Sequence, residues 1–385
     1  MSPAPPDAQA HEATRQSRLH TPLCDVLGIR HPIMLAGMNS VSTAELAAAV
    51  SNAGGFGSIG GQSFAPAALR TELQELTSLL HEDKKRNFGV DLLLPQVEGE
   101  NARKTNYDYT EGKLPELIEI ICEFRPKLFI CAVGVPPVWA VEKLHQHGVL
   151  VMNMVGSVRN CEKALKVGAD LICAQGYEAG GHTGDVATSV LVPLCCDVVR
   201  KSGRRMCAGC CVADGRSTTK AQHLPPPPVL VVGAGGIFDG RGLAAVLSLG
   251  ATAGWVGTRF VCTTESHAPK HHKEKILRSG SSDTVRTLLL TGRPLRLIPN
   301  GYIKEGEKDP GRVQKLLEEG KIPVYEDVGR DWDLRIPARE AATSLAGQAC
   351  GGVKEILSAK EVVDRMVREA CAILLQNRKM VVVGG

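Results

Sequence analysis

Residues 229–266 read VLVVGAGGIFDGRGLAAVLSLGATAGWVGTRFVCTTES, and this stretch decides the fold class. An apolar run at 229–236 ends in glycines, a helical pattern continues to Leu249, and Gly250 precedes a second apolar run at 252–260. Short, continuous apolar runs are typical of parallel strands that are buried on both faces. A glycine after a helical pattern supplies the left-handed residue that ends the helix. The stretch therefore predicts a strand, a helix and a second parallel strand.

The same unit recurs upstream, where Gly55, Gly148 and Gly168 each follow a helical pattern and precede an apolar run. Counting such runs gives eight expected strands, at residues 31–38, 56–60, 87–95, 128–135, 149–156, 169–176, 229–236 and 252–260. Eight alternating units favour an α/β fold of the (β/α)8 TIM-barrel type over an open doubly wound sheet. The open sheet would need a glycine-rich fingerprint after its first strand, whereas the sequence GGFGSIGG follows a helix and contains a strand.

Helix starts agree with this assignment. Residues 42–45 (STAE) have the pattern of a capping box, and Asp239 is placed to cap the helix that runs to Leu249. The eighth helix is expected beyond the last strand, around His267, His271 and His272.

Three segments lie outside the repeat. Residues 1–18 are expected to be a disordered lead, because they lack the apolar core of a signal peptide. Residues 19–280 form the barrel, with a polar insertion at 204–228 that ends in a polyproline run. Residues 281–385 are expected to be a C-terminal α+β lobe, and covering the barrel mouth is one option for it. Its expected elements are two strands at 285–290 and 295–298, and helices at 313–319 and 360–375.

The composition excludes several functional classes. The 385 residues carry a net charge of +4 without a basic tract, so neither a nucleic-acid partner nor a membrane-surface partner is expected. No run approaches the 18 or more apolar residues of a spanning helix. The chain has 13 cysteines, an odd number, and most lie in apolar runs. These features indicate a cytoplasmic protein whose cysteines are small core residues.

Two glycine-rich turns predict a phosphate site. In a (β/α)8 barrel the active site lies at the carboxyl ends of the strands, and the loops after strands seven and eight commonly bind phosphate. The seventh expected strand ends in Gly235 and Gly236, and the eighth ends in Gly257 and Thr258. Glycines let backbone N–H groups approach phosphate oxygens, and the hydroxyl of Thr258 adds a donor. Arg259 follows Thr258 directly, and two roles remain open for it: neutralising the phosphate, or forming an ion pair elsewhere.

The loop after the sixth expected strand predicts a catalytic histidine. It reads AQGYEAGGHTG over residues 174–184, so His182 is surrounded by glycines at a strand end. Packing alone does not require these neighbours. Because the ordinary pKa of histidine lies near neutral pH, His182 is a candidate general base or acid.

These motifs resemble the nitronate monooxygenase family, formerly called 2-nitropropane dioxygenases, which are FMN-dependent barrel enzymes. The resemblance runs from about His31 to Ser266 and is carried by HPIMLAGM (31–38), STAELAAAVSNAGGFGSIGG (42–61), residues 174–184 and residues 229–266. It implies oxidation of alkyl nitronates, or of nitroalkanes, with O2 to a carbonyl compound and nitrite. NAD(P)H-dependent flavin reductases that act on quinones or enoyl thioesters share these motifs and are the alternative. A flavin- or phosphate-binding protein without catalysis is disfavoured by the His182 loop.

The resemblance also implies roles for individual residues. His182 matches the family's catalytic base, which also positions anionic substrates. Gly235, Gly236, Gly257 and Thr258 match contacts to the FMN phosphate. Gln175, Gly180 and Gly181 match contacts to the loop side of the flavin, and Ala36, Gly37 and Met38 match contacts to the flavin ring. The oligomeric state is left open, with a homodimer as one option.

Two strand ends depart from the family pattern. The first-strand motif commonly reads Gln-Ala-Pro-Met, whereas here it reads Leu35-Ala-Gly-Met38, which lacks the polar side chain and loosens the backbone. The third strand usually offers an Asn to the flavin, and Asp91 stands there instead. An ionised carboxylate only accepts hydrogen bonds, so we expect Asp91 to oppose negative charge on a reduced flavin.

No metal site is expected. Cys207, Cys210 and Cys211 have C-x-x-C spacing, but a structural zinc site needs four ligands and the only nearby partner in the sequence is His223. Reduced cysteines on the insertion are the favoured interpretation, and a disulfide formed during purification remains open.

Overall fold

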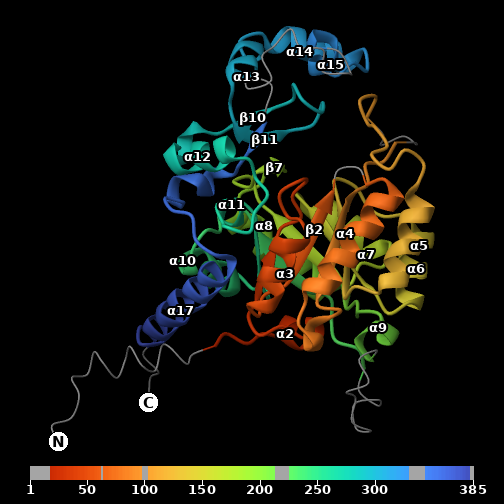
Figure 1. Ribbon diagram of the computed structural model, residues 1–385, viewed down its shortest axis with the longest axis vertical. Coiled ribbons are helices and arrows are strands. Elements are labelled where there is room, and N and C mark those ends of the chain that lie inside the picture. The colour runs from red at the N-terminus through yellow and green to blue at the C-terminus, as the bar shows by residue number, and fades with distance from the viewer. Residues whose placement is uncertain (1–17, 62–63, 98–102, 213–224, 329–342, 382–385) are drawn as a thin grey trace, which may run out of the picture.

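The computed structural model describes residues 18–61, 64–97, 103–212, 225–328 and 343–381 (Figure 1). The expected lead at 1–18 therefore lies outside the described residues, except for Arg18. Of the expected insertion at 204–228, residues 213–224 lie outside them as well, and so does His223.

Eight parallel strands form a barrel, which confirms the predicted fold class. They are β1 (Ile33–Leu35), β2 (Gly57–Gly61), β3 (Phe88–Leu93), β4 (Leu128–Ala132), β5 (Leu150–Val155), β6 (Leu171–Gln175), β8 (Leu230–Ala234) and β9 (Gly254–Val256). Their order is β1-β9-β8-β6-β5-β4-β3-β2, and a parallel bridge between Met34 and Phe56 joins the two ends of this order. Each expected strand overlaps an observed one, although β1 and β9 are much shorter than expected.

Alternation along the strands produces two core layers. Inside the barrel, Met34, Ile130, Met152, Val232 and Trp255 belong to one buried cluster. Their neighbours in sequence face the surrounding helices and belong to a second cluster. Because every strand is buried on both faces, continuous apolar runs were the correct signal for them.

Helices surround the barrel strands (Figure 1). They are α3 (Ala44–Asn52), α4 (Pro66–Leu79), α5 (Leu114–Phe124), α6 (Val138–Gln146), α7 (Val158–Lys166), α8 (Thr188–Ser202), α10 (Gly240–Ser248) and α17 (Ala359–Arg378). Between β2 and β3 lies a 3-10 turn, η1 (Glu82–Lys84).

The assignment of the eighth helix is corrected by the structure. Helix α17 packs between α10 and α3, and Val363, Met366 and Ala370 on its inner face join the outer core layer. The segment expected to be the eighth helix is α12 (Lys270–Arg278), which packs instead against the short helix η4 (Gln348–Gly352). Helix α17 has a long apolar face that suits the barrel wall, whereas α12 buries only His272 and Ile276.

One of the two predicted caps is confirmed. Asp239 accepts hydrogen bonds from the backbone N–H groups of Arg241 and Gly242 at the start of α10. The predicted capping box at 42–45 is wrong, because α3 begins at Ala44 and the side chain of its N-cap residue, Thr43, makes no capping hydrogen bond. The backbone nitrogen of Ala44 donates to the carboxylate of Glu72 instead. The Ser42 hydroxyl instead bonds the backbone of Met38, 2.7 Å from its nitrogen.

The C-terminal segment contains the predicted strand pair and helices. Strands β10 (Val285–Thr287), β11 (Leu295–Ile298) and β12 (Ser344–Leu345) form an antiparallel sheet, and β11 also pairs with β7 (Gly181–His182). Further elements of this segment are η3 (Ser281–Asp283), α13 (Gly301–Gly306), α14 (Pro310–Glu318) and α15 (Pro323–Val328). Since β7 belongs to the loop after β6, this small sheet is hydrogen-bonded to the carboxyl end of the barrel, which is the upper end in Figure 1.

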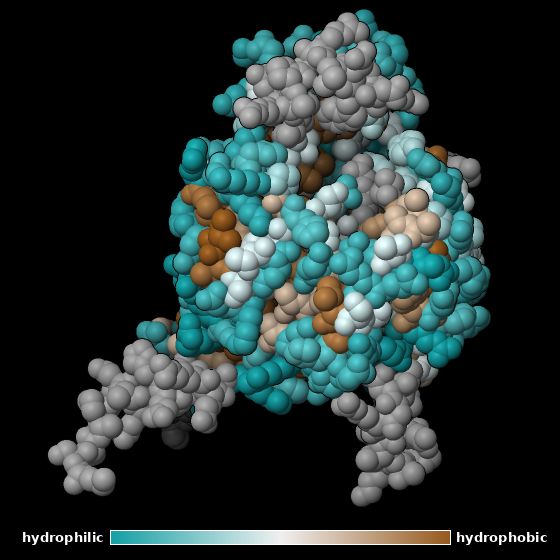
Figure 2. Space-filling model, viewed as in Figure 1, coloured by the Kyte–Doolittle hydropathy of each residue, from teal (hydrophilic) through white to brown (hydrophobic). Residues whose placement is uncertain are grey.

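Short helices lie at the opposite, amino end of the barrel. Helix α2 (Pro22–Leu27) places Leu23 and Leu27 in the interior cluster, and α9 (Ala208–Val212) contacts α6. Another short helix, α11 (Thr258–Val261), follows β9 at the carboxyl end of the barrel. Figure 2 shows apolar residues in scattered patches among hydrophilic ones on one face of the molecule. Within the described residues, no helix is both long and apolar enough to cross a membrane.

Candidate active site

The predicted site residues all lie at or just beyond the carboxyl ends of barrel strands, or in the loop that contains β7. Strands β1, β9, β8 and β6 are consecutive in the barrel, so their ends are neighbours. Ala36, Gly37 and Met38 follow β1, and Gln175 ends β6. Gly235 and Gly236 follow β8, and Gly257 and Thr258 follow β9. Gly180, Gly181 and His182 belong to the loop that contains β7, and Asp91 lies in β3.

The turn after β8 needs its two glycines for different reasons. Gly235 and Gly236 have φ values of 103° and 73°, in the left-handed region that favours glycine. A Cβ on Gly235 would lie 2.6 Å from the hydroxyl oxygen of Thr188, whereas a Cβ on Gly236 would meet only the Cβ of Glu178, at 3.8 Å. The backbone at Gly236 is therefore open to a ligand, and Gly235 lets α8 approach the turn.

Helix α8 begins against this same turn. The backbone nitrogen of Thr188 donates to the Glu178 carboxylate at 3.0 Å, and the Thr188 hydroxyl lies 2.8 Å from that carboxylate and 3.2 Å from the carbonyl oxygen of Ala234. Glu178 is thus directed at the start of α8, and the turn is fixed from its outer side.

The turn after β9 presents a hydroxyl group. The Thr258 hydroxyl oxygen accepts a hydrogen bond from the backbone nitrogen of Gly347 at 2.9 Å, so its proton remains for another acceptor. Arg259 points away, because it donates to the carbonyl oxygen of Glu355 at 3.0 Å. Of the two roles left open for Arg259, the structure supports neither an ion pair nor phosphate neutralisation; its partner is a backbone carbonyl.

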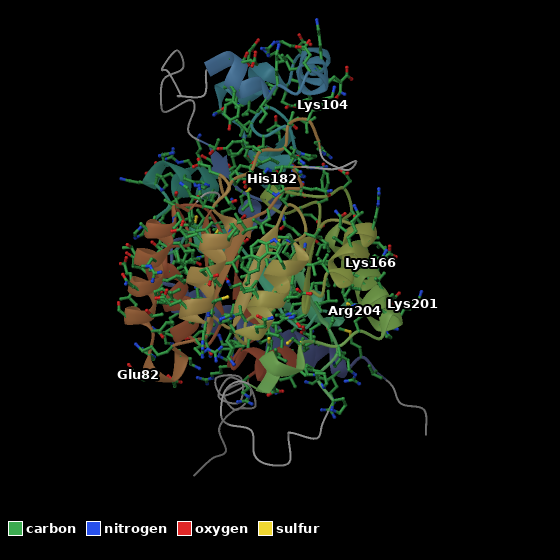
Figure 3. All side chains as sticks on the ribbon, turned by 90° about the vertical axis from the view of Figure 1, so that its right-hand side faces the viewer. Glu82, Lys104, Lys166, His182, Lys201 and Arg204 are labelled. Atoms are coloured by element: carbon green, nitrogen blue, oxygen red, sulfur yellow. The ribbon has the colours of Figure 1, made fainter. Side chains whose placement is uncertain are left out.

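His182 is held from two sides. The Gln175 side chain donates to the carbonyl oxygen of His182 at 2.7 Å, and β7 pairs with β11 so that His182 lies opposite Leu295. The imidazole Nε2 of His182 lies 3.0 Å from the hydroxyl oxygen of Thr291. Figure 3 shows His182 at the junction of the barrel with the C-terminal segment.

The His182 side chain is neutral near pH 7. Burial, with a further contribution from the positive charge of Arg293, lowers its pKa to about 4. A neutral imidazole can accept a proton at one nitrogen while donating from the other. The positive charge of this site therefore belongs to Arg293 and not to the histidine.

Residues 291–294 complete the site, and the sequence did not reveal them. Arg293 donates to the side-chain oxygen of Asn106 at 2.6 Å, and the backbone nitrogen of Thr183 donates to the carbonyl oxygen of Pro294 at 3.2 Å. This turn between β10 and β11 is more than 100 residues from His182 in the chain. Its letters, TGRP, are those of any polar turn, so only the pairing of β7 with β11 identifies it.

Two further arginines lie against the same loop. The guanidinium carbons of Arg286 and Arg296 lie 4.7 and 4.5 Å from the ring centroid of Tyr177. The Arg296 side chain is 2% exposed and donates to the carbonyl oxygen of Tyr177 at 3.2 Å. Hydrogen bonding to Arg296, then to Arg286, lowers the pKa of Tyr177. Tyr177 is thus held against two arginines, of which Arg286 also forms an ion pair with Asp185 at 2.7 Å.

Asp91 and Gly37 occupy one space. Asp91 alternates along β3 with Val90 and Leu92 of the outer layer, so its carboxyl group lies inside the barrel. A Cβ on Gly37 would lie 2.3 Å from Asp91 Oδ2 and 2.5 Å from Asp91 Cβ. Glycine at 37 therefore makes room for the carboxyl group, and the departures at positions 37 and 91 form a single structural feature.

The expectation of an ionised Asp91 is corrected by its environment. Its side chain is 2% exposed, Oδ1 has no hydrogen-bond partner among the described residues, and burial raises its pKa to about 8. At pH 7 the group is mostly the neutral acid, which can donate a hydrogen bond as an amide does. It therefore does not place a negative charge at the bottom of the site.

Leu35, the other departure, is fully buried in the outer core layer. A polar side chain is absent there, and apolar packing against the helices takes its place.

A (β/α)8 barrel with a histidine loop and glycine-rich turns at its carboxyl end has the arrangement typical of an enzyme of this fold. Comparison with known proteins makes this specific. The family model "NMO: Nitronate monooxygenase" matches residues 20–369, so the chain belongs to the nitronate monooxygenase family and is a flavin oxidoreductase.

Individual relatives carry different names. A "Probable nitronate monooxygenase" of Staphylococcus saprophyticus subsp. saprophyticus is 32% identical over 311 residues, which cover 74% of this chain and 80% of the relative. A Mycobacterium tuberculosis protein is 28% identical over 390 residues, covering 92% of this chain and 96% of the relative. It is named "(3aS,4S,5R,7aS)-5-hydroxy-7a-methyl-1-oxo-octahydro-1H-indene-4-carboxyl-CoA dehydrogenase". Among solved structures, FabK from Thermotoga maritima superposes with a TM-score of 0.73 at 28% identity, covering 94% of this chain and 100% of that one.

Proposed function

We propose that the protein uses FMN and O2 to oxidise alkyl nitronates, and nitroalkanes where it can deprotonate them, to a carbonyl compound and nitrite. The observation that carries this proposal is a neutral His182 fixed beside the cationic Arg293 at the carboxyl end of the barrel. Such a pair suits a substrate that is either an anion or a weak carbon acid.

The glycine turns fit FMN. Gly236 is open at the turn after β8, and Thr258 has a hydroxyl proton to donate at the neighbouring turn. Together with Gly235 and Gly257 they would hold the phosphate. The residues that would lie along the ring are Ala36, Gly37, Met38, Asp91, Gln175, Gly180 and Gly181. When bound, FMN supplies the electron-transfer chemistry, which no side chain of the site provides.

Hydrogen bonding selects the basic nitrogen of His182. The Thr291 hydroxyl is placed to donate to the carbonyl oxygen of Arg293, 3.4 Å away, so its oxygen is left to accept the Nε2 proton of His182. In this tautomer Nδ1 carries the lone pair. Nδ1 is therefore the atom that takes the α-proton of a nitroalkane, and Thr291 is the residue that positions the ring.

Arg293 supplies the attraction for an anionic substrate. Its guanidinium group is half-buried, and burial followed by repulsion from Arg103 lowers its pKa, which shows that the charge is held at a cost. A nitronate brought next to this group would compensate that charge in a site of low effective dielectric. Arg293 thus takes the anion-binding role that the resemblance gave to the histidine.

A paired assay tests the proposal on the purified, flavin-containing protein. One arm supplies propionate 3-nitronate under air and follows oxygen uptake and nitrite. The other supplies NADH or NADPH without oxygen and follows the flavin absorbance. Nitrite formation without bleaching by the pyridine nucleotides is expected, and bleaching without nitrite would refute the proposal.

An NAD(P)H-dependent flavin reductase is the second candidate, acting on an enoyl thioester or a quinone. The specific observation behind it is the relative named as a carboxyl-CoA dehydrogenase, which aligns with 92% of this chain. Arg286 and Arg296, which lie over the ring of Tyr177, would also suit a phosphate-bearing thioester. Rapid anaerobic bleaching, followed by reoxidation of the flavin on adding an enoyl-CoA, would favour this function over the first.

A further inference from the structure

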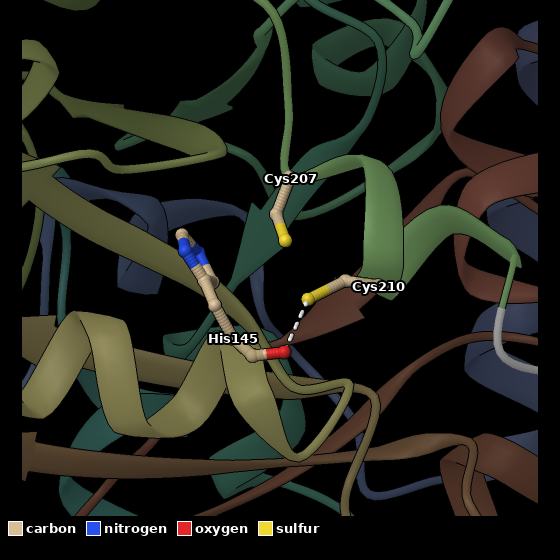
Figure 4. Close-up of side chains that lie close together, drawn as sticks. All are labelled: His145, Cys207 and Cys210. Atoms are coloured by element: carbon tan, nitrogen blue, oxygen red, sulfur yellow. Dashed lines mark hydrogen bonds between the residues drawn. The ribbon is translucent and has the colours of Figure 1, made fainter.

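A histidine and two cysteines meet at the amino end of the barrel. One imidazole nitrogen of His145 and the sulfur atoms of Cys207 and Cys210 all lie within 4.8 Å of one another (Figure 4). His145 belongs to the last turn of α6, Cys207 directly precedes α9, and Cys210 is three residues further on the same face of α9. In Figure 1, α9 and α6 lie beside each other, and α9 is at the end opposite to β7 and His182.

We propose that His145, Cys207 and Cys210 bind one Zn2+ ion. Two thiolates and an imidazole form a ligand set that zinc prefers, and a water molecule commonly takes the fourth position when the protein supplies three ligands. Zinc–sulfur bonds of about 2.3 Å and zinc–nitrogen bonds of about 2.0 Å place tetrahedral ligands roughly 3.5–3.8 Å apart. The three ligand atoms lie no more than 4.8 Å apart, which exceeds this spacing by roughly 1 Å at most, so small side-chain rotations suffice.

A buried carboxylate organises the ligands. Asp170 is 1% exposed; its Oδ2 lies 2.7 Å from Nε2 of His145, and its Oδ1 accepts a hydrogen bond from the backbone nitrogen of Cys207 at 2.6 Å. A carboxylate that takes the outer N–H of a metal-binding histidine fixes the ring and its tautomer. With Nε2 committed to Asp170, the lone pair for the metal is on Nδ1 of His145.

Burial also favours the assembled site. Cys210 is 4% exposed, and its thiol is directed at the carbonyl oxygens of His145 and Val149, 3.5 and 3.6 Å away. Cys207 and His145 are partly exposed, which leaves a route for the ion. Binding replaces the two thiol protons by two sulfur–zinc bonds and releases the protons to solvent. The sequence concealed this site because His145 precedes Cys207 by 62 residues and comes from a different helix.

Zinc stoichiometry and cobalt spectra test the proposal. Full-length reduced protein is stripped with a chelator and then titrated with Zn2+ or with Co2+. One equivalent is expected to bind, with cobalt giving a thiolate charge-transfer band and intense visible bands of a tetrahedral site. Cys207→Ser and Cys210→Ser should abolish the charge-transfer band of the site, and Asp170→Asn should weaken zinc binding by about 10–100-fold.

Matched controls separate the site from general effects. His145→Asn should weaken zinc binding by more than Asp170→Asn does, whereas His147→Asn, two residues along, should not change it. Cys196→Ser removes a half-buried thiol outside the cluster and should leave the cobalt spectrum intact.

A measurement on the unmutated chain covers the case in which a variant does not fold. Zinc should protect Cys207 and Cys210 from alkylation, as located by mass spectrometry of the labelled peptides. Equal labelling of both cysteines with and without zinc would overturn the proposal. Wild-type zinc affinity in Cys207→Ser, or a Cys207–Cys210 disulfide that persists under reductant, would overturn it as well.

Discussion

Replacing Asp91 by Asn should make the stability of the protein less sensitive to a rise in pH between about 4 and 8. In the folded barrel, burial raises the pKa of Asp91 to about 8, whereas an unfolded chain has the ordinary value near 3.8. Between these values the folded state holds one proton that the unfolded state has lost. Stability therefore falls as pH rises through this window, because the slope of unfolding free energy with pH follows the difference in bound protons.

The size of the effect follows from how steeply the free energy of unfolding changes with pH, and not from how far the pKa is raised. One proton corresponds to about 1.4 kcal/mol per pH unit. Between pH 5 and pH 7 the wild-type chain should lose about 2.7 kcal/mol relative to Asp91→Asn, which is about 100-fold in the unfolding equilibrium. The side-chain amide has nearly the same shape, so Gly37 still accommodates it.

Urea unfolding of the flavin-free proteins at pH 5, 6 and 7, followed by circular dichroism, measures this difference. All other titrating groups are shared by the two chains and cancel in the comparison. Glu82→Gln, which changes an exposed carboxylate whose side chain is 92% exposed (Figure 3), should run parallel to the wild type. If the stability difference between wild type and Asp91→Asn does not change with pH, Asp91 is not a buried neutral acid.

Four further predictions concern the site. His182→Asn should lower turnover of neutral nitroalkanes by about 10²–10⁴-fold and that of preformed nitronates far less; equal losses in the two assays would exclude the base role. In the wild type, kcat/KM for nitroalkanes should stay constant from pH 8 to about pH 5 and fall only toward the lowered pKa of His182, near 4; a midpoint near 6.5 would contradict the burial argument. Arg293→Gln should raise KM for nitronates by about tenfold or more, with Arg293→Lys recovering part of the loss; an unchanged KM would assign the anion site elsewhere. Gly180→Ala would bring a Cβ within 2.6 Å of the backbone nitrogen of Gly347 and should destabilise the chain by about 1–3 kcal/mol, whereas Gly311→Ala on α14 should not.

The barrel could be predicted from the sequence because its strands are buried on both faces. Each strand is then a local apolar run, and helices α3, α6, α7, α8 and α10 are each followed within two residues by a glycine of positive φ, so these signals do not depend on distant contacts. The position of α17 could not be predicted in this way. Its amphipathic pattern predicts a helix, but its place between α10 and α3 depends on packing with residues more than 100 positions earlier.

The candidate site likewise combines residues that local sequence predicts with residues that only the fold brings together. His182 and the two glycine turns stand out because glycine is needed where a backbone adopts positive φ or approaches another segment closely, as at Gly235. Arg293 and Thr291 have no such local requirement and become part of the site only through the pairing of β7 with β11. The expectation of an ionised Asp91 is wrong for a related reason, since the pKa of a carboxyl group depends on its burial, which a sequence does not show.

Gly37 and Asp91 show how a three-dimensional constraint can explain two apparently separate sequence features. A side chain at 37 would occupy the place of the carboxyl group, so any larger residue there requires the group at 91 to move. The buried carboxyl group, in turn, is tolerated because it is neutral, and a neutral acid can donate a hydrogen bond where the family's amide would. We therefore expect the two positions to be coupled: Gly37→Ala should be destabilising in the wild-type chain, and the cost should fall in an Asp91→Gly background, which removes both the carboxyl group and the Cβ that the new methyl group would meet. Additive stability changes in this double-mutant cycle would show that the two departures are independent.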